Sequence, residues 1–267
     1  MLERLRVEPG TAAGIDGRDP GDRLGFADKD AGRVALDALA VRLDELHGRL
    51  WAEGDRAVLL VLQGMDASGK DGAIRTVLSG LNPQGCSVAS FKAPTDAELA
   101  QDYLWRVHAA TPPRGHIGAF NRSHYEDVVA ARAIGVVSPE ECARRYGHIV
   151  DFERLLTDEG TTVVKVFLHI SKDEQRERLQ ARIDDPTKGW KFRVADLEVR
   201  ARWDEYHVLY EEAITATSTD EAPWFVVPAD RKWVRDAAVA TLLVETLERL
   251  DPRIPAPDPA VLGLRVD

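Results

Sequence analysis

A glycine-rich stretch from Gly64 to Gly72 constrains the fold of this chain more than any other part. It reads G-M-D-A-S-G-K-D-G and contains the spacing G-x-x-x-x-G-K. An unbroken apolar run at 57–62 precedes it, as a strand buried on both faces requires, and residues 73–78 can start a helix. In this setting backbone N–H groups and the positive helix end surround a phosphate, while Lys70 reaches its outer oxygens. The pattern predicts a P-loop; the alternative is a glycine-rich surface turn.

One position of the loop departs from the common form of the motif. In the common form the lysine is followed by Ser or Thr, whose hydroxyl binds Mg²⁺, whereas in this chain Lys70 is followed by Asp71. Carboxylates in the right region to hold the metal instead are Asp66, within the loop, and either Glu126 or Asp127. Asp71 itself is interpreted either as part of the site or as a first-turn acid that the helix dipole favours.

The composition is that of an ordinary globular α/β protein. At 267 residues, with 44% hydrophobic and 30% charged residues, one large domain is expected. No apolar stretch approaches the roughly 18 residues that span a bilayer, and the first residues lack an apolar signal core. We therefore expect a cytoplasmic protein that does not enter membranes. The net charge of -10 argues against general nucleic-acid binding, and the two cysteines are expected to be free thiols.

Apolar strands alternate with amphipathic helices along the chain. This order predicts an α/β fold with a parallel sheet covered by helices on both faces, and a site at the carboxyl ends of the strands. Residues 1–32 are predicted to form an irregular arm that either lies on the domain or is partly disordered, 33–250 the domain itself, and 251–267 an extended tail. Strands are expected at 57–62, 87–91, 116–120, 162–170 and 224–228; helices are expected at 34–51, 95–110, 138–160, 196–215 and 234–250, and from 171 onward.

Two further stretches should meet the phosphate loop at that edge. Arg122 follows the strand at 116–120 directly, so it can clamp phosphate oxygens, although a surface salt bridge is the simpler interpretation. His124 is interpreted as structural. The second stretch, about 176–193, is basic and also carries Trp190. It is typical of the mobile lid of nucleotide kinases, although a charge run can also be a solvated face.

Several long blocks of the sequence resemble the polyphosphate kinase 2 family. They occur in the family's order between about Val34 and Leu250 and read G-M-D-A-S-G-K-D-G, F-N-R-S-H-Y-E-D, H-I-S-K-D-E-Q-R-E-R-L, D-P-T-K-G-W-K-F and A-P-W-F-V-V-P-A-D-R-K-W. Asp after the lysine is the family's own form of the loop. The resemblance implies a P-loop kinase fold related to thymidylate kinase, with a helical lid. The F-N-R-S-x-Y-E-D form is similar to the subgroup that accepts both AMP and ADP.

The resemblance also implies roles for individual residues. The catalytic set is Asp66, Lys70 and Arg122, with Asp66 favoured as the ligand of Mg²⁺, for which Mn²⁺ can substitute. Asn121 and Arg122 form a Walker B-like pair, although some relatives have Asp where this chain has Asn121. Further nucleotide- or phosphate-binding positions are Gly64, Ala67, Ser68, Gly69, Asp71, Asn121 and Glu126, and the polyphosphate-binding lid residues are Arg178, Arg182, Lys188 and Lys191.

The resulting hypothesis is a reversible, Mg²⁺-dependent phosphotransferase acting between inorganic polyphosphate and the adenine nucleotides AMP, ADP and ATP. Relatives assemble as dimers or larger, so a homo-oligomer (dimer or tetramer) is expected. One alternative is a conventional nucleotide kinase that uses ATP as donor. Another is a non-catalytic protein that binds nucleotide or polyphosphate. A regulatory GTPase is disfavoured because the chain has no guanine-reading N-K-x-D pattern.

Overall fold

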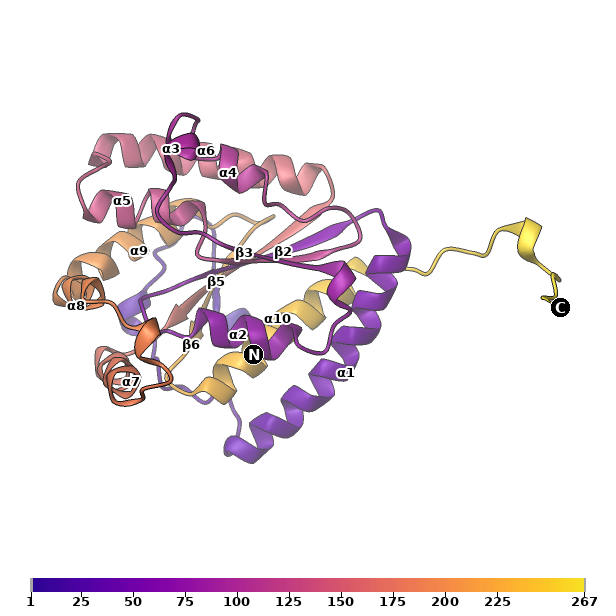
Figure 1. Cartoon of the computed structure of the whole chain (residues 1–267), viewed down its shortest axis with the longest axis horizontal. Coiled ribbons are helices and arrows are strands. Elements are labelled where there is room, and N and C mark those ends of the chain that lie inside the picture. Colours follow the sequence, from indigo (N-terminus) through magenta and orange to yellow (C-terminus); the bar gives the residue numbers. More distant parts are fainter. Residues whose placement is uncertain (1, 267) are drawn as a thin grey trace.

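The computed structural model describes residues 2–266 and shows a central sheet with helices on both faces (Figure 1). The strands lie in the order β1-β6-β5-β2-β4-β3. Five of them run parallel, and β1 pairs antiparallel with β6 at one edge. The predicted parallel sheet is therefore confirmed, with an antiparallel edge strand added. The strands are β1 (Arg6–Val7), β2 (Ala57–Gln63), β3 (Cys86–Ser90), β4 (Ile117–Asn121), β5 (Thr161–His169) and β6 (Trp224–Pro228).

The helices form one layer on each side of the sheet. In Figure 1, α1, α2 and α10 cover one face, and α4, α6 and α9 cover the other. The helices are α1 (Lys29–Glu53), α2 (Lys70–Leu78), α3 (Asp96–Leu99), α4 (Trp105–His108), α5 (Ala130–Ala133), α6 (Pro139–Asp158), α7 (Lys172–Asp184), α8 (Ala195–Ala201), α9 (Trp203–Thr217) and α10 (Lys232–Leu250).

Side-chain caps begin the helices where the sequence predicted them. Thr95 and Glu98 form a reciprocal capping box at α3. Ser138 caps α6 just before a first-turn proline, and the Ser171 side chain accepts from the backbone of Glu174 at α7. These three starts are confirmed.

Two helices predicted as continuous are each interrupted. The segment 95–110 divides into α3 and α4 because Asp102 accepts a hydrogen bond from the backbone of Leu104 and forms a turn between them. No residue of α3 is buried, so packing does not oppose this break. The segment 196–215 divides into α8 and α9 at Arg202, whose φ of −101° and ψ of 28° leave the helical region. The Arg202 guanidinium donates to the carbonyl of Ala133.

The N-terminal segment is folded onto the domain over its described residues. It contributes β1 and buries Leu5, Val7, Ile15 and Leu24. Arg18 holds the segment together by donating to several of its own backbone carbonyls. Residues of the domain bond it as well: Glu211 accepts from the backbone N–H groups of Gly14 and Ile15, and Ser218 donates to the carbonyl of Val7. These contacts fix the segment although its sequence has little periodic pattern. Position 1 of the predicted arm lies outside the described residues.

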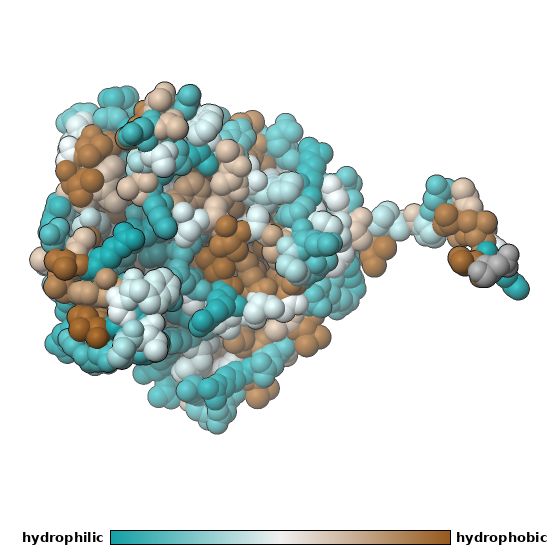
Figure 2. Space-filling view, in the orientation of Figure 1, coloured by the Kyte–Doolittle hydropathy of each residue, from teal (hydrophilic) through white to brown (hydrophobic). Residues whose placement is uncertain are grey.

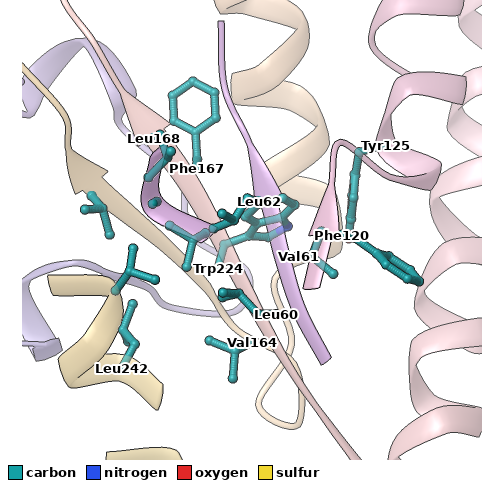
Figure 3. Packing of buried hydrophobic residues seen from close by; sticks show 14 of the residues in the cluster. Leu60, Val61, Leu62, Phe120, Tyr125, Val164, Phe167, Leu168, Trp224 and Leu242 are labelled. Atoms are coloured by element: carbon teal, nitrogen blue, oxygen red, sulfur yellow. The ribbon is translucent and has the colours of Figure 1, made fainter. Parts of the chain in front are cut away.

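The core lies on both faces of β2, whose seven residues are all buried. Figure 3 shows Leu60 and Leu62 of this strand between Leu242 of α10 on one side and Phe120 and Tyr125 on the other. Because the sheet is covered on both faces, a site that is open to solvent has to lie at the strand ends.

The C-terminal segment 251–266 leaves the domain as an extended segment with one short turn at Pro259–Val261 (Figure 1). Its apolar side chains are exposed, and Figure 2 shows hydrophobic surface at its far end. Position 267 of the predicted tail is not among the described residues. Within residues 2–266, no helix is both long and apolar enough to cross a bilayer.

Candidate active site

The glycine loop joins β2 to α2 at the carboxyl edge of the sheet, as a P-loop requires. Gly64 has a φ of 146°, and a Cβ there would lie 2.7 Å from the carbonyl oxygen of Leu168. Gly69 has a φ of 103°, and a Cβ would lie 1.8 Å from Nη1 of Arg235. Both positions have a positive φ that residues other than glycine rarely adopt, and at Gly64 a side chain would also meet the backbone of Leu168. The sequence spacing G-x-x-x-x-G-K is therefore a requirement of the loop's geometry.

Lys70 is the first residue of α2, and its ammonium is held inside the loop. Nζ donates to the carbonyl oxygens of Gly64 at 2.6 Å and Met65 at 3.3 Å, and the residue is only 8% exposed. Burial lowers the pKa of Lys70 to about 8, the Arg122 guanidinium acts in the same direction, and neighbouring carboxylates oppose both. The ammonium is therefore charged at neutral pH and is fixed by the carbonyls of its own loop.

The loop also presents a hydroxyl without a partner. Ser68 is fully buried, and its Oγ makes no hydrogen bond to any described residue. An unpaired buried hydroxyl is costly, whereas a phosphate oxygen in the loop can accept its hydrogen. Together with the N-terminus of α2, this donor is suited to an anion.

Arg122 lies between two carboxylates where the chain leaves β4. Its φ of 62° is left-handed, and its backbone N–H donates to the carbonyl of Leu62 at 3.1 Å. The guanidinium pairs with Asp66 through one nitrogen and with Glu126, 3.1 Å away, through the other. Glu126, followed by Asp66, raises the pKa of Arg122, so the side chain is always cationic. Strained backbone of this kind occurs at functional sites.

The carboxylates around Arg122 are suited to Mg²⁺ by their chemistry. Asp66 and Glu126 offer oxygen ligands, and each is 17% exposed. Within residues 2–266, no three or more His, Cys, Asp or Glu side chains form a metal-binding group. Mg²⁺ commonly takes one or two carboxylates and completes its shell with water and substrate phosphate. The donor set at this edge therefore fits that ion.

Glu126 and Asp127, the two carboxylates after β4 that the sequence suggested as metal ligands, have different partners in the structure. Glu126 faces Arg122, whereas Asp127 pairs with the buried Arg106 at 3.2 Å. Asp71 lies in the first turn of α2 and accepts a hydrogen bond from the Asn121 amide. The unusual residue of the loop thus contacts the residue at the Walker B-like position.

Arg178 is positioned beneath the loop. Its Nη1 donates to the carbonyls of Ala67 and Ser68 at 3.0 and 3.1 Å. Its Nη2 donates to the carbonyls of Ala229 and Asp230 at 2.7 and 2.8 Å. The side chain is 10% exposed, so this arginine ties the phosphate loop to the segment after β6. The sequence grouped Arg178 with the lid cations, but in the structure its donors serve the protein itself.

The remaining lid cations lie on the end of α7 and the loop after it. Lys188 pairs with Asp185, and Lys191 stacks on Trp190, whose exposed fraction is 77%. Burial, followed by the charge of Asp66, raises the pKa of Asp196, and Arg182 acts in the opposite direction. Helix α7 adjoins the phosphate loop, since Gln175 donates to the carbonyl of Asp66 at 3.0 Å, and the predicted lid cations at 188 and 191 are exposed.

Two cations that the sequence analysis did not single out also reach this region. Arg235 of α10 lies against Gly69, and Lys232 has a lowered pKa because of burial and the proximity of Arg178, Arg235 and Lys188. They follow the carboxyl end of β6, which is where a parallel sheet places its ligands. That position was the available signal, but the sequence analysis gave this segment only as part of a block that resembles the family and placed the last helix at 234–250.

His124 does not reach the site. It is 1% exposed, and its Nε2 lies 3.2 Å from a carboxylate oxygen of Glu153. Lys165 donates to the other oxygen of Glu153 at 2.6 Å and to the hydroxyl of Tyr125 at 3.2 Å. These residues form a buried polar network beneath the turn that carries Arg122.

A glycine loop with a buried lysine, opposite an arginine and two carboxylates at the edge of a parallel sheet, defines a P-loop kinase. Residues 26–255 match the family described as Polyphosphate kinase 2 (PPK2). The chain belongs to this polyphosphate kinase family.

Individual relatives support the same assignment. The chain is 52% identical to the AMP/ADP-polyphosphate phosphotransferase of Meiothermus ruber, over 97% of each chain. It is 47% identical to the ADP-polyphosphate phosphotransferase of Rhodopseudomonas palustris, over 82% of this chain and 80% of that one. It superimposes on the crystal structure of polyphosphate kinase 2 from Arthrobacter aurescens TC1 with a TM-score of 0.92 and 46% identity, covering 96% of this chain and 92% of that one.

The contacts of Arg178 predict that lysine cannot replace it. One ammonium cannot donate to four carbonyls on two segments, so Arg178→Lys is expected to lower kcat/KM by about tenfold or more, close to the loss in Arg178→Ala. Steady-state assays at several polyphosphate concentrations measure kcat/KM for both variants. A lysine variant that keeps near-normal kcat/KM while the alanine variant does not would assign Arg178 to charge neutralisation instead of loop support.

Proposed function

We propose that this protein transfers the terminal phosphate of inorganic polyphosphate to AMP and to ADP, and catalyses the reverse reaction. The proposal rests on two cations at one edge of the sheet, Lys70 held by the Gly64 carbonyl and Arg122 held by Asp66. They occur in a chain that is 52% identical, over almost its whole length, to an AMP/ADP-polyphosphate phosphotransferase. Phosphoryl transfer depends mainly on positioning and charge neutralisation, which these residues supply.

In the forward reaction a terminal phosphate oxygen of the acceptor attacks the terminal phosphorus of polyphosphate. A new P–O bond forms, the bridging P–O bond breaks, and a polyphosphate shorter by one unit leaves. Lys70 and the Ser68 hydroxyl donate to the transferred group, and Arg122 offsets the charge that accumulates on its oxygens. Asp66 and Glu126 would hold Mg²⁺, which would supply further positive charge to the transferred phosphate.

The donor is expected to lie along the cations between the lid and α10. Lys188 and Lys191 are exposed there, and Lys232 lies near Lys188. Arg235 lies against Gly69 but is buried and pairs with Asp236 at 2.6 Å. A local concentration of cations attracts a polyanion to an otherwise acidic protein. Because such attraction is screened, added salt should weaken polyphosphate binding more than it weakens catalysis by bound substrate.

A donor and acceptor assay tests the proposal. Protein, Mg²⁺ and polyphosphate are mixed with AMP or with ADP, and ADP and ATP are measured. The expected result is phosphate transfer to both acceptors, with polyphosphate a better donor than ATP. Transfer only from ATP would identify a conventional nucleotide kinase. Nucleotide and polyphosphate binding without any product would identify a non-catalytic binding protein.

The lid assignment predicts a selective effect on the donor. Lys188→Ala with Lys191→Ala removes two exposed cations, so the KM for polyphosphate should rise by about tenfold while the KM for AMP changes little. Arg33→Ala with Arg49→Ala, on α1, makes the same change in net charge at another element and is the control. Equal increases in both KM values would refute the donor groove.

The oligomeric state and the cellular location are also proposed. A homo-oligomer, dimer or tetramer, and a cytoplasmic location follow from the family resemblance and the sequence pattern. Light scattering on the purified chain measures the mass in solution. A monomer at all concentrations tested would contradict the expected homo-oligomer.

A further inference from the structure

Gln63 ends β2 and directly precedes Gly64 of the phosphate loop. The other six residues of the strand are apolar, and all seven, Gln63 included, are buried. The exposed fraction of Gln63 is 0%. Burying an amide is costly unless its polar atoms are hydrogen-bonded, so the partners of this side chain indicate its role.

Those partners also decide which end atom of the amide is oxygen. One end atom lies 3.1 Å from the backbone nitrogen of Ser123 and 3.1 Å from its hydroxyl oxygen. A backbone N–H only donates, so this end atom is the carbonyl oxygen. The Ser123 hydroxyl accepts from the backbone N–H of Tyr125 at 3.2 Å and keeps its own hydrogen to donate. The amide oxygen of Gln63 therefore accepts two hydrogen bonds from Ser123.

The amide nitrogen of Gln63 then faces the carboxylate of Glu126. It lies 3.0 Å from Oε1, whereas Oε2 of the same carboxylate lies 3.1 Å from Arg122. Each oxygen of Glu126 thus has a partner of its own. Contacts at both oxygens fix the orientation of the carboxylate as well as its position, which one contact would not do.

The two partners of Glu126 differ in how firmly they are held. The Arg122 side chain is 40% exposed and also pairs with Asp66, so an incoming phosphate can draw its guanidinium away from Glu126. Gln63 is fully buried and its oxygen is bonded to Ser123, so it cannot follow a substrate. Gln63 is therefore the partner that Glu126 keeps when Arg122 turns toward phosphate.

An amide is suited to this position because it carries no charge. A cation at position 63 would neutralise Glu126 and compete with a metal ion for its oxygens. The amide of Gln63 orients the carboxylate and leaves its negative charge in place. The Glu126 side chain is 17% exposed, and its two oxygens have more lone pairs than these two contacts use.

We propose that Gln63 is a positioning residue for phosphate transfer, which holds the Glu126 carboxylate in the orientation that binds Mg²⁺. The inference rests on the proposed role of Glu126 as a metal ligand. Loss of a hydrogen-bond partner of a metal-binding group typically lowers metal affinity or activity by about 10- to 100-fold. Gln63 acts through Glu126 and does not itself touch substrate.

Mn²⁺ binding to the full chain, followed by electron paramagnetic resonance of the free ion, measures this effect without turnover. The binding that Asp66→Asn removes defines the site. Gln63→Met has a side chain of similar length without an N–H group and should weaken this binding by about tenfold or more. Equal affinities in the wild type and Gln63→Met, or Mn²⁺ binding that Asp66→Asn leaves unchanged, would overturn the proposal. Because no phosphate is transferred, the result does not depend on which donor the enzyme uses.

Steady-state assays separate positioning from stability. Gln63→Met should raise the Mg²⁺ concentration that gives the half-maximal rate by about tenfold, while the KM for AMP changes little. Leu50→Ala is the control, because Leu50 is fully buried and lies near Gly115 before β4, at the edge of the sheet opposite the site. It should lower stability and keep the normal Mg²⁺ requirement. Equal shifts in the two variants would attribute the effect to lost stability and refute the positioning role.

A double-mutant cycle with Glu126→Gln tests whether Gln63 acts through that carboxylate. If it does, adding Gln63→Met to Glu126→Gln should lower kcat/KM by less than about twofold further, because the carboxylate that Gln63 positions is already absent. Losses that multiply in the double variant would mean that Gln63 acts independently of Glu126, and the proposal would be wrong.

Discussion

Lys70→Met is expected to lower kcat/KM for polyphosphate by roughly 100- to 1,000-fold while the chain stays folded. The ammonium is positioned by the carbonyls of Gly64 and Met65 before any substrate arrives, so its charge acts on the transferred group without reorganisation. Methionine fills the same space without the charge. Circular dichroism checks the fold, and steady-state assays with AMP and with ADP measure the loss, which should be similar for both acceptors.

The pH profile gives an independent measure of the same side chain. Because the pKa of Lys70 is lowered to about 8, the free enzyme loses this positive charge as pH rises through that value. The kcat/KM for polyphosphate should therefore fall on the alkaline side, and this limb should disappear in Lys70→Met. A wild-type profile that stays flat to pH about 10, the ordinary range for lysine, would mean that the ammonium is less buried than the structure places it.

The sequence was sufficient for features that depend on local pattern. The glycine spacing predicted the P-loop, because Gly64 and Gly69 both have a positive φ that other residues rarely adopt. Apolar runs predicted the parallel strands, and Ser or Thr before an acidic first turn predicted the helix starts. In each case the residues that determine the structure are neighbours in the chain.

Features that depend on distant partners could not be predicted. The basic segment suggested that Arg178 faces substrate, but its four carbonyl partners lie on two loops that are more than 50 residues away. The interruption of the predicted helix at 196–215 involves Arg202 and a carbonyl 69 residues earlier. Hydrogen bonds to backbone carbonyls leave no residue-type signal in the partner segment, so neither contact is visible in the sequence.

The buried lysine at the centre of β5 is a third feature of this kind. Lys165 stands within the most strand-like run of the chain and is 0% exposed. Its partners are Glu153 of α6, Tyr125 after β4 and the carbonyl of Thr217 at the end of α9. Four elements thus meet at one ammonium. The sequence indicated a strand here but could not indicate that a charge would be buried within it.

We expect Lys165→Met to destabilise the protein by about 3–5 kcal/mol, because the Glu153 carboxylate is then buried without its cation. Burial and the loss of the attraction between the two charges would both raise the pKa of Glu153, whose value is now held below normal by Lys165 and His124 against the effect of burial. For a chain of this size the melting temperature should fall by roughly 10 °C. Thermal and urea unfolding followed by circular dichroism measure the loss.

The double variant Lys165→Met with Glu153→Gln distinguishes an unpaired charge from lost packing. Glutamine keeps an oxygen for the Tyr125 hydroxyl, which lies 2.8 Å from Glu153, and carries no charge. If the cost of the single variant is the uncompensated carboxylate, the double variant should recover more than half of the stability, since replacing both members of a buried pair is far less costly than removing one. A double variant no more stable than Lys165→Met would instead attribute the loss to the methionine's fit among Tyr125, Trp224 and the end of α9. The ion pair would then contribute little to holding the turn that carries Arg122.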